Sequence, residues 1–346
     1  MPSAIDLHEL TLRVPLFAEL DEDDLRYVLR AAQPLEFAPG ALMVRQGQSA
    51  DSALFMGRGR ARVFNLLPGG GESVVGELGP GSVLGEMALL DSGVRSASVM
   101  ASEPTACLSM SRDAFRMLIA QGNRAVLAIN HRITLALCQR LRELNGKILA
   151  RAVPEHLAPA VLNRPHQWRP CAFDYAAFLS LLPALRHFSA DEMAVLLLAT
   201  QAFDLPRGAL LFEAGAACDA CYVVVRGALE ISREQNGAHR RIGILGPGRL
   251  CGILALIEGQ AHSMSATARE DVTLLAIPRA AFARYYSGEA AGALKFQQAI
   301  NQELLQSLAR TNNHLTRLIS QARIRNQVRQ ADEFQRALAE QECRAG

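Results

Sequence analysis

The alternation of apolar and polar residues divides the chain into two copies of one pattern. Within each copy, apolar and polar residues alternate over runs of four to seven residues, and glycines separate these runs. In the first copy the runs lie between about residues 35 and 110, as in the segments 60–64 and 72–78. A period of two residues is typical of half-buried strands, and glycines mark the turns. The pattern therefore predicts a compact antiparallel roll or barrel in each copy.

Helical periods flank the alternating runs. Residues 20–33 have an acidic first turn, and Asp21 precedes the first apolar positions as a plausible N-cap. Residues 125–150 place apolar side chains three and four positions apart, which predicts a long amphipathic helix. A second long helix begins near Ala290, and the pattern stays helical through 312–342 without glycine or proline. We expect this tail to be a solvated or coiled-coil helix.

The two copies are similar in sequence as well as in pattern. The offset between matching segments stays at 167 or 168 residues along the whole comparison, which indicates a duplicated domain. The matching pairs are 39–47 with 207–215, 53–64 with 221–232, and 78–90 with 245–257.

The duplication predicts an α+β protein with two jelly-roll-like antiparallel β-rolls, each flanked by helices, and a long C-terminal helix. Four prolines between residues 151 and 170 exclude one continuous helix there and indicate a linker. We predict a first domain at 1–150, a proline-rich linker at 151–177, a second domain at 178–315 and a helical tail at 316–346.

Composition and charge favour a folded protein of the cytoplasm. Half of the 346 residues are apolar, the net charge is only +2, and of the 36 basic residues only Lys147 and Lys295 are lysines. The arginine excess therefore reads as a compositional bias, not as a basic surface that binds nucleic acid. The first ten residues lack the pattern of a secretion signal, and the longest apolar run, 194–200, is too short to span a bilayer. We expect no membrane span.

The seven cysteines do not form a disulfide framework. Their number is odd and their spacing is irregular, which favours reduced thiols in a cytosolic protein. Cys218 and Cys221 have the spacing of a pair that could bind zinc or perform redox chemistry. A second pair is missing, and the apolar residues 221–225 predict a buried strand, so we interpret Cys221 as a small apolar residue and expect no metal site.

One short segment carries candidate binding chemistry. In "LGEMALLDSGVRSASVM", residues 84–100, Glu86 follows a glycine, and Arg95 precedes three small residues. An arginine presents a planar fork of donors that fits a phosphate, and small residues allow backbone amides to approach the remaining oxygens. A carboxylate only accepts hydrogen bonds, so Glu86 fits a hydroxyl of the ligand. The segment therefore predicts a site for a ligand that carries a phosphate beside a hydroxyl.

This segment resembles the phosphate-binding cassette of cyclic nucleotide-binding domains, the family of the bacterial catabolite activator protein and of the regulatory subunits of cyclic AMP-dependent protein kinase. The resemblance implies that Glu86 accepts the ribose 2′-hydroxyl and that Arg95 pairs with the cyclic phosphate. It also implies that Gly85 lets the backbone come close, and that the Ser96 and Ala97 amides complete the cradle. The implied ligand-binding residues are Gly85, Glu86, Met87, Ala88, Arg95, Ser96, Ala97 and Asn145.

The first cassette departs from the family pattern at one position, and it does not decide which base is bound. Val94 stands where kinase-type members often have proline, which changes the stiffness of the loop but not its charge. Ser96 is compatible with cyclic AMP and with cyclic GMP. In the family a long helix usually covers the base, and matching residues 138–148 to that helix puts Leu144 and Asn145 near the purine.

The second cassette, residues 251–267, has lost both charged positions. Ile253 stands in place of Glu86, and His262 stands in place of Arg95. Losing one partner of a desolvated charge pair typically costs about 2–5 kcal/mol, and here two contacts are gone. We therefore predict that the second domain does not bind a cyclic nucleotide. The alternative is that a protonated His262 still holds a phosphate at acidic pH, or that the domain binds a different ligand.

Three classes of function follow from these observations. The first is a receptor that binds cyclic AMP, or cyclic GMP, in its first domain and relays the change through helices to a protein partner. The second is a transcription regulator, which needs room for a winged helix-turn-helix. About thirty proline-rich residues after the first helix and about thirty-five without a turn after the second do not provide it. The third is a scaffold or dimerisation protein that retains the fold without sensing.

The receptor is the favoured function. Four further expectations concern catalysis, DNA binding, self-association and cyclic di-GMP. The sequence has no P-loop, kinase glycine loop or nucleophile elbow, so we expect no enzymatic activity and no cofactor. We also expect no specific DNA binding, while a homodimer is compatible with the apolar stripes of the two long helices. Cyclic di-GMP would need a wider pocket than a single Arg95 suggests.

Overall fold

The computed structural model describes residues 14–17, 20–66, 71–90, 93–151, 169–171, 175, 179–183, 185–235, 237–288 and 290–345, with side chains described up to residue 322. Its contacts divide the chain into two compact units, and each unit combines parts of both sequence repeats. Unit 1 contains Met1–Ala136 and Ala283–Leu305, and unit 2 contains Leu137–Phe282 and Gln306–Gly346. The predicted boundaries at residues 150 and 178 are therefore not unit boundaries, and as repeat boundaries they stay a prediction.

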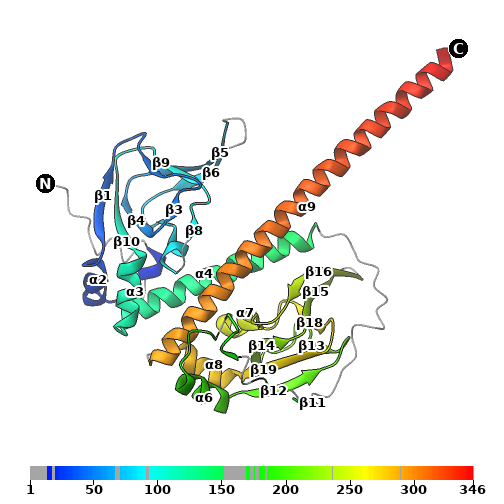
Figure 1. Ribbon diagram of the computed structural model, residues 1–346. Coiled ribbons are helices and arrows are strands. Elements are labelled where there is room, and N and C mark those ends of the chain that lie inside the picture. Colours follow the sequence, from blue (N-terminus) through cyan, green and yellow to red (C-terminus); the bar gives the residue numbers. More distant parts are fainter. Residues whose placement is uncertain are drawn as a thin grey trace. The chain divides into compact units, whose positions relative to one another are not determined.

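Unit 1 contains the first β-roll, drawn from blue to cyan in Figure 1. Two four-stranded antiparallel sheets have the orders β1-β10-β4-β7 and β2-β9-β5-β6, and β3 pairs with β8. The predicted antiparallel roll is thus confirmed. Its strands are β1 Gln33–Phe37, β2 Leu42–Val44, β3 Ser49–Ala50, β4 Ser52–Arg58, β5 Ala61–Leu66, β6 Glu72–Leu78, β7 Val83–Leu84, β8 Gly93–Val94, β9 Ser98–Ala101 and β10 Thr105–Ser111.

Unit 2 contains the second roll, which repeats this topology. Its sheets have the orders β11-β12-β19-β14-β17 and β13-β18-β15-β16, so each strand of the two main sheets of the first roll has a counterpart in the same place. The strands are β11 Arg169–Pro170, β12 Gln201–Leu205, β13 Leu210–Phe212, β14 Ala220–Arg226, β15 Leu229–Gln235, β16 Ala238–Leu245, β17 Leu250–Cys251, β18 Ser265–Ala268 and β19 Val272–Pro278. Strand β11 lies in the predicted linker and pairs with β12, whereas residues 152–168 of that linker lie outside the described residues.

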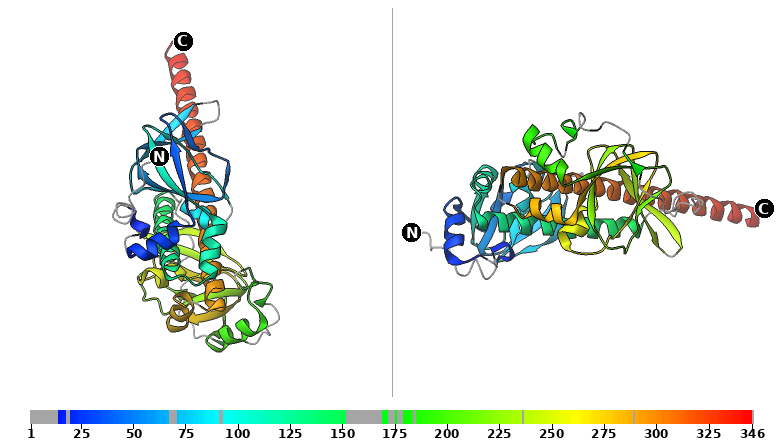
Figure 2. Two further views of the ribbon diagram at one scale, coloured as in Figure 1. Left: turned by 90° about the vertical axis from the view of Figure 1, so that its left-hand side faces the viewer. Right: turned by 90° about the horizontal axis from the view of Figure 1, so that it is seen from below.

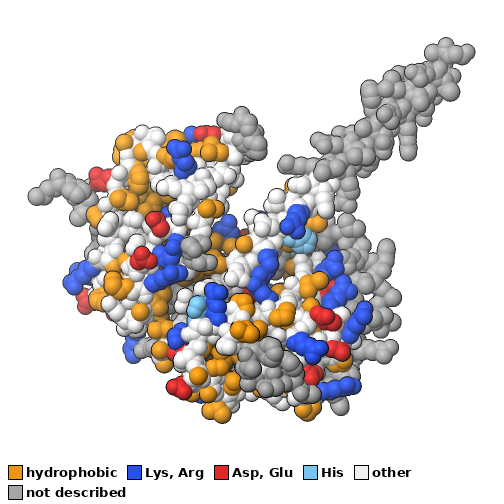
Figure 3. Space-filling model, in the orientation of Figure 1, with side chains coloured by type: hydrophobic (Ala, Val, Ile, Leu, Met, Phe, Trp, Pro, Cys, Tyr) orange, Lys and Arg blue, Asp and Glu red, His pale blue; other side chains and the backbone are white. Residues whose placement is uncertain are grey.

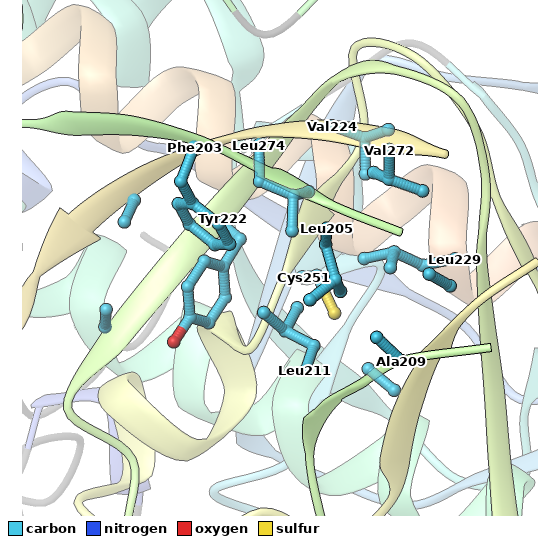
Figure 4. Packing of buried hydrophobic residues seen from close by; sticks show 14 residues of the cluster. Phe203, Leu205, Ala209, Leu211, Tyr222, Val224, Leu229, Cys251, Val272 and Leu274 are labelled. Atoms are coloured by element: carbon cyan, nitrogen blue, oxygen red, sulfur yellow. The ribbon is translucent and has the colours of Figure 1, made fainter. Parts of the chain in front are cut away.

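Each roll encloses its own apolar core. In unit 1, Leu54, Met56 and Cys107 are among the buried side chains that pack between the sheets. In unit 2 the core is larger, and Figure 4 shows the rings of Phe203 and Tyr222 beside Leu274 and Cys251. Phe203 and Tyr222 pack edge to face with their centroids 6.1 Å apart. Strands β14 and β19, which carry Tyr222 and Leu274, are buried along nearly their whole length and bring these side chains together.

Two of the helices, α2 and α6, begin at a polar cap that is followed by acidic residues. Asp21 is the N-cap of α2, as predicted, and its carboxylate accepts a 2.8 Å hydrogen bond from the Asp24 amide. Ser189 and Glu192 form a reciprocal capping box at α6. The helices are η1 Pro15–Phe17, α2 Glu22–Leu29, η2 Glu86–Leu89, α3 Arg112–Ala120, α4 Arg124–Leu149, α6 Ala190–Leu198, α7 Ile253–Glu258, α8 Arg279–Tyr286 and α9 Ala291–Ala345.

The two long helices, α4 and α9, each contribute to both units. The first half of α4 belongs to unit 1 and the rest, from Leu137, belongs to unit 2. Helix α9 continues from Ala291 to Ala345 without a break, as its single orange-to-red ribbon in Figure 2 shows, so the predicted helical tail is confirmed. Among the described residues, no helix is long and apolar enough to cross a membrane. Acidic and basic side chains are mixed over the face shown in Figure 3, in line with the small net charge.

Candidate functional site

The first cassette is held between strands of the first roll. Leu84, in β7, pairs with Leu54 in β4, and Gly85 then turns the chain into η2 with a left-handed φ of 70°. After β8, the Arg95 amide donates to the Gln48 carbonyl, and the Arg95 carbonyl accepts from the Gly47 amide, both at 2.8 Å. The backbone on either side of the cassette is therefore fixed by strand-like hydrogen bonds.

The side chain of Arg95 is buried and only partly satisfied. It is 8% exposed, and its Nη2 donates to the Ser52 carbonyl at 2.8 Å and to the Ser52 hydroxyl at 3.3 Å. Its Nη1 is buried and has no hydrogen-bond partner among the described residues. Burial lowers the pKa of Arg95, the nearby Asp51 and Glu86 raise it, and Arg112 lowers it. An arginine keeps its proton through such shifts, so this site presents a buried cation with an open donor.

Gly85 is required by the position of this guanidinium. A Cβ atom on Gly85 would overlap with Arg95 Nη1 and lie 3.4 Å from the Ser52 carbonyl. The positive φ independently favours glycine. Two constraints, one from the backbone and one from a side chain, therefore converge on the same residue.

The remaining predicted residues of the first cassette lie in η2 and directly after Arg95. Glu86 and Met87 are half-buried at the start of η2, and Ala88 is buried within it. Ser96 is exposed and Ala97 is half-buried directly after Arg95. The structure thus brings together the seven predicted residues of the first cassette. Their individual roles toward a ligand stay predictions.

Two arginines that the sequence analysis missed hold the cassette helix in place. Arg112, at the start of α3, donates from Nε to the Ala88 carbonyl at 2.7 Å and from Nη2 to the Ala50 carbonyl. Arg116 donates to the Leu90 carbonyl at 3.3 Å. These bonds couple η2 to α3. No sequence motif identifies these two arginines, because their acceptors are backbone carbonyls.

A buried polar cluster joins α4 to the first part of α9 within unit 1. The Thr134 hydroxyl donates to Asn301 Oδ1 at 2.7 Å, and Asn301 Nδ2 donates to Asn130 Oδ1 at 2.8 Å. All three residues are buried. Thr134 and Asn301 occupy matching positions of the two repeats at the offset of 167, so equivalent positions of the two helices are in contact in unit 1. A buried polar group of this kind fixes the register of paired helices.

Asn145, predicted near the base of a ligand in the first roll, lies in unit 2. It lines a cavity of about 290 Å³ together with residues of the second roll, and its side chain is 8% exposed. The physical reason is the length of α4, whose 26 residues extend about 39 Å at 1.5 Å per residue. Its last half therefore packs in unit 2, and a role of Asn145 toward the first roll stays a prediction.

The second cassette has the same left-handed glycine turn as the first and different chemistry. Gly252 has a left-handed φ of 86°, and a Cβ atom there would lie 3.3 Å from His262 Cε1, so His262 occupies the place that Arg95 has in unit 1. Its ring stacks on Phe212 with the centroids 3.7 Å apart and the planes at 8°. Ile253 is 2% exposed. An aromatic stack and an aliphatic side chain thus replace the cation and the acid.

The titration of His262 predicts an acid-sensitive unit 2. Burial lowers the pKa of His262 from 6.5 to about 4, against a small opposite effect of Asp219. The unfolded chain then binds this proton at a higher pH than the folded chain does, so stability is full above pH 6.5 and falls as the pH drops toward 4. We expect a loss of about 1–3 kcal/mol over this window.

The measurement for this prediction compares urea unfolding of the wild type and of His262→Phe at pH 7.0, 5.5 and 4.5. Phenylalanine keeps the stack on Phe212 and does not titrate. The wild type should lose more stability than the variant as the pH falls. Equal pH dependence of the two proteins would contradict the prediction.

The Cys218 and Cys221 thiols are buried in unit 2. Cys221 lies in β14, as the apolar pattern of residues 221–225 predicts, and burial raises its pKa far above the usual range. Burial also raises the pKa of Cys218, whose thiol donates to the Ala220 carbonyl at 3.4 Å. The two sulfurs are therefore protonated thiols near neutral pH.

Comparison with known proteins identifies both rolls. A sequence model of the family described as "Cyclic nucleotide-binding domain" matches residues 34–122 and 203–288, which together are just over half of the chain. The two matched segments contain the first and the second cassette. The match thus agrees with the internal duplication and with the two equivalent sheet topologies.

Three similar proteins can be named. The cyclic AMP receptor protein of Thermus thermophilus is 34% identical over 129 residues, 37% of this chain and 58% of that protein. A cAMP-dependent protein kinase regulatory subunit of Aspergillus fumigatus is 25% identical over 283 residues, 78% of this chain and 56% of that protein. The crystal structure of the Thermus thermophilus catabolite activator protein matches with 33% identity and a TM-score of 0.36, covering 40% of this chain and 63% of that one. The chain thus spans less than two thirds of each of these relatives.

Proposed function

The chain belongs to the cyclic nucleotide-binding domain family, and from this premise we propose that it is a receptor that binds one cyclic nucleotide, cyclic AMP, in the first roll. The observation that carries this proposal is the buried guanidinium of Arg95. Its Nη1 has no partner among the described residues, and it lies against a glycine that leaves room for it. A buried donor on a cation is stabilised by an anion, and a cyclic phosphate supplies one.

The chemistry of the neighbouring residues fits the rest of such a ligand. Glu86 stands at the start of η2, beside Arg95, and its carboxylate can accept a hydrogen bond from a ribose 2′-hydroxyl. The Ser96 and Ala97 amides follow Arg95 directly and can approach the phosphate oxygens because both side chains are small. Ser96 is compatible with either purine, so cyclic GMP is the second candidate ligand.

Helix α4 is the element that would relay binding. It is continuous from Arg124 to Leu149, and in unit 2 its Arg142 forms an ion pair with Glu258 of α7. The Leu149 carbonyl at its C-terminal end accepts a 2.9 Å hydrogen bond from Arg240 of β16. A shift of α4 that starts at the first roll would therefore reach the second roll through these contacts. Such a switch requires that the nucleotide binds one position of α4 better than the other.

The wider setting of the receptor is part of the same proposal. We place it in the cytoplasm with a protein partner that reads the helices, and we assign it neither a catalytic nor a specific DNA-binding role. The alternative is a non-sensing scaffold, for which the decayed second cassette is the supporting observation. The presence of both Glu86 and Arg95 favours the receptor, since a scaffold has no use for a buried cation with an open donor.

The test is calorimetric titration of the full chain, first freed of any nucleotide carried through purification. We expect about one cyclic AMP per chain, weaker binding of cyclic GMP, and none of cyclic di-GMP. Two cyclic AMP per chain would contradict the assignment to the first roll alone. No heat with any of the three ligands, in a folded and nucleotide-free sample, would overturn the receptor and leave the scaffold.

A further inference from the structure

The cavity of about 290 Å³ in unit 2 is a ligand-sized space next to the second cassette. Its walls come from the sheet of β13, β15 and β16, from the start of α7, and from the parts of α4 and α9 that belong to unit 2. A volume of this size lies near the lower end of small-molecule pockets. The second cassette lacks the two charged residues of the first, and the space beside it is still open.

The walls of the cavity nearest to the second cassette are uncharged and include two stacked aromatic rings. Ile253 and His262 both line the cavity, and so does Phe212, on which the His262 ring stacks. The low pKa of His262 keeps this ring neutral at neutral pH. An anion placed against these groups would lose its hydration without gaining a partner, which costs several kcal/mol. The aromatic stack instead offers surface to a ring of the ligand.

One buried acceptor in the cavity is left open. Asn145 lines it from α4, and its Oδ1 atom is buried without a hydrogen-bond partner among the described residues. A buried acceptor without a donor costs about 1–3 kcal/mol. An N–H or O–H group of a ligand would remove this cost, so the ligand needs at least one donor.

The basic residues of the lining outside the second cassette lie on α9. Arg310 is exposed and donates to the Ser307 hydroxyl at 2.9 Å. His314 is half-buried, and its ring is held by the Ile242 carbonyl at 3.0 Å. Neither side chain is a fully buried cation, whereas Arg95 of the first cassette is buried and has an open donor. The charge of the cavity therefore favours neutral ligands.

We propose that the second roll binds an uncharged, flat and mostly apolar small molecule with at least one hydrogen-bond donor, and that it rejects cyclic nucleotides. The ligand would lie between the Phe212–His262 stack and the helices, with its donor on Asn145 Oδ1. Because α4 and α9 form part of the walls, an occupied cavity would stabilise their packing in unit 2. Ligand binding in the second roll would thus act on the same two helices, α4 and α9, as a second signal.

The test uses indole as a neutral, flat probe with one N–H donor, and 1-methylindole as its counterpart without a donor. Binding to the full chain is followed by saturation-transfer NMR and titration at up to millimolar probe, with excess cyclic AMP present throughout to occupy any cyclic nucleotide site. We expect indole to bind about 3- to 10-fold more tightly than 1-methylindole, which is the effect of one neutral hydrogen bond. In Asn145→Leu the two affinities should become equal.

A pair of variants on α9 locates the probe. Thr311 lines the cavity and is half-buried, so Thr311→Trp should fill the cavity and weaken indole binding more than 10-fold. Thr316 is exposed on the same helix and does not line the cavity, so Thr316→Trp is the matched control and should bind indole normally. No indole binding to the folded wild type in the presence of cyclic AMP, or equal binding by Thr311→Trp and Thr316→Trp, would each overturn the proposal.

Discussion

Replacing Arg95 with alanine is expected to weaken cyclic AMP binding by roughly thirty- to several-thousand-fold, the consequence of leaving a desolvated phosphate unpaired. The variant removes the donor that is buried at Nη1 and leaves unchanged the apolar side chains, such as Leu54 and Met56, that form the core of the first roll. Arg95→Lys should recover only part of the affinity, since a lysine is a point charge without the planar fork. The measurement is the dissociation constant from calorimetry at fixed salt.

Two controls accompany this variant: a substitution at the matching position of the second cassette, and a measurement of thermal stability. His262 occupies the position matching Arg95 in the second cassette, so His262→Ala should leave the cyclic AMP affinity unchanged. The thermal midpoint of ligand-free Arg95→Ala should stay at or above that of the wild type, because a buried cation with an open donor is removed. Loss of affinity in both variants, or in neither, would show that Arg95 does not hold the ligand.

The β-rolls were predictable because their signals are local. Alternation of apolar residues and glycine turns acts over five to ten residues, and the strand orders that follow are the same in both rolls. Gly85 and Gly252 show the same point at single positions, since both adopt a positive φ at the start of the cassette helices. The repeat offset located these equivalent turns without any knowledge of the packing.

The use of the long helices was not predictable from local patterns. The apolar spacing shows that α4 is amphipathic, but it does not show which unit each half belongs to. Asn145 was placed near a purine in the first roll because the family resemblance matches residues 138–148 to the helix that covers the base. One long-range signal does exist in the sequence. Thr134 and Asn301 are polar residues in otherwise apolar helix stripes at the repeat offset, and they form a hydrogen bond with each other in unit 1.

The Gly85→Ala variant separates backbone strain from displacement of Arg95. Alanine in the left-handed region costs about 1–2 kcal/mol wherever it is placed. At Gly85 the added methyl group would also occupy the position of Arg95 Nη1, so the guanidinium must move away from the phosphate site. We expect at least a tenfold loss of cyclic AMP affinity, because the geometry of a charge-assisted pair is broken while its charge remains.

Gly252→Ala is the matched control for this effect. Its φ of 86° gives a similar strain, and the added methyl group would lie 3.2 Å from the Ala220 carbonyl and 3.3 Å from His262 Cε1, without reaching a cation. Both variants should therefore lose similar stability in thermal unfolding, while only Gly85→Ala should lose affinity in calorimetry. If Gly85→Ala bound cyclic AMP within twofold of the wild type, the contact between Gly85 and Arg95 would not shape the site. A tenfold loss in Gly252→Ala would instead mean that the second cassette acts on the first, because its own residues carry no group for the phosphate.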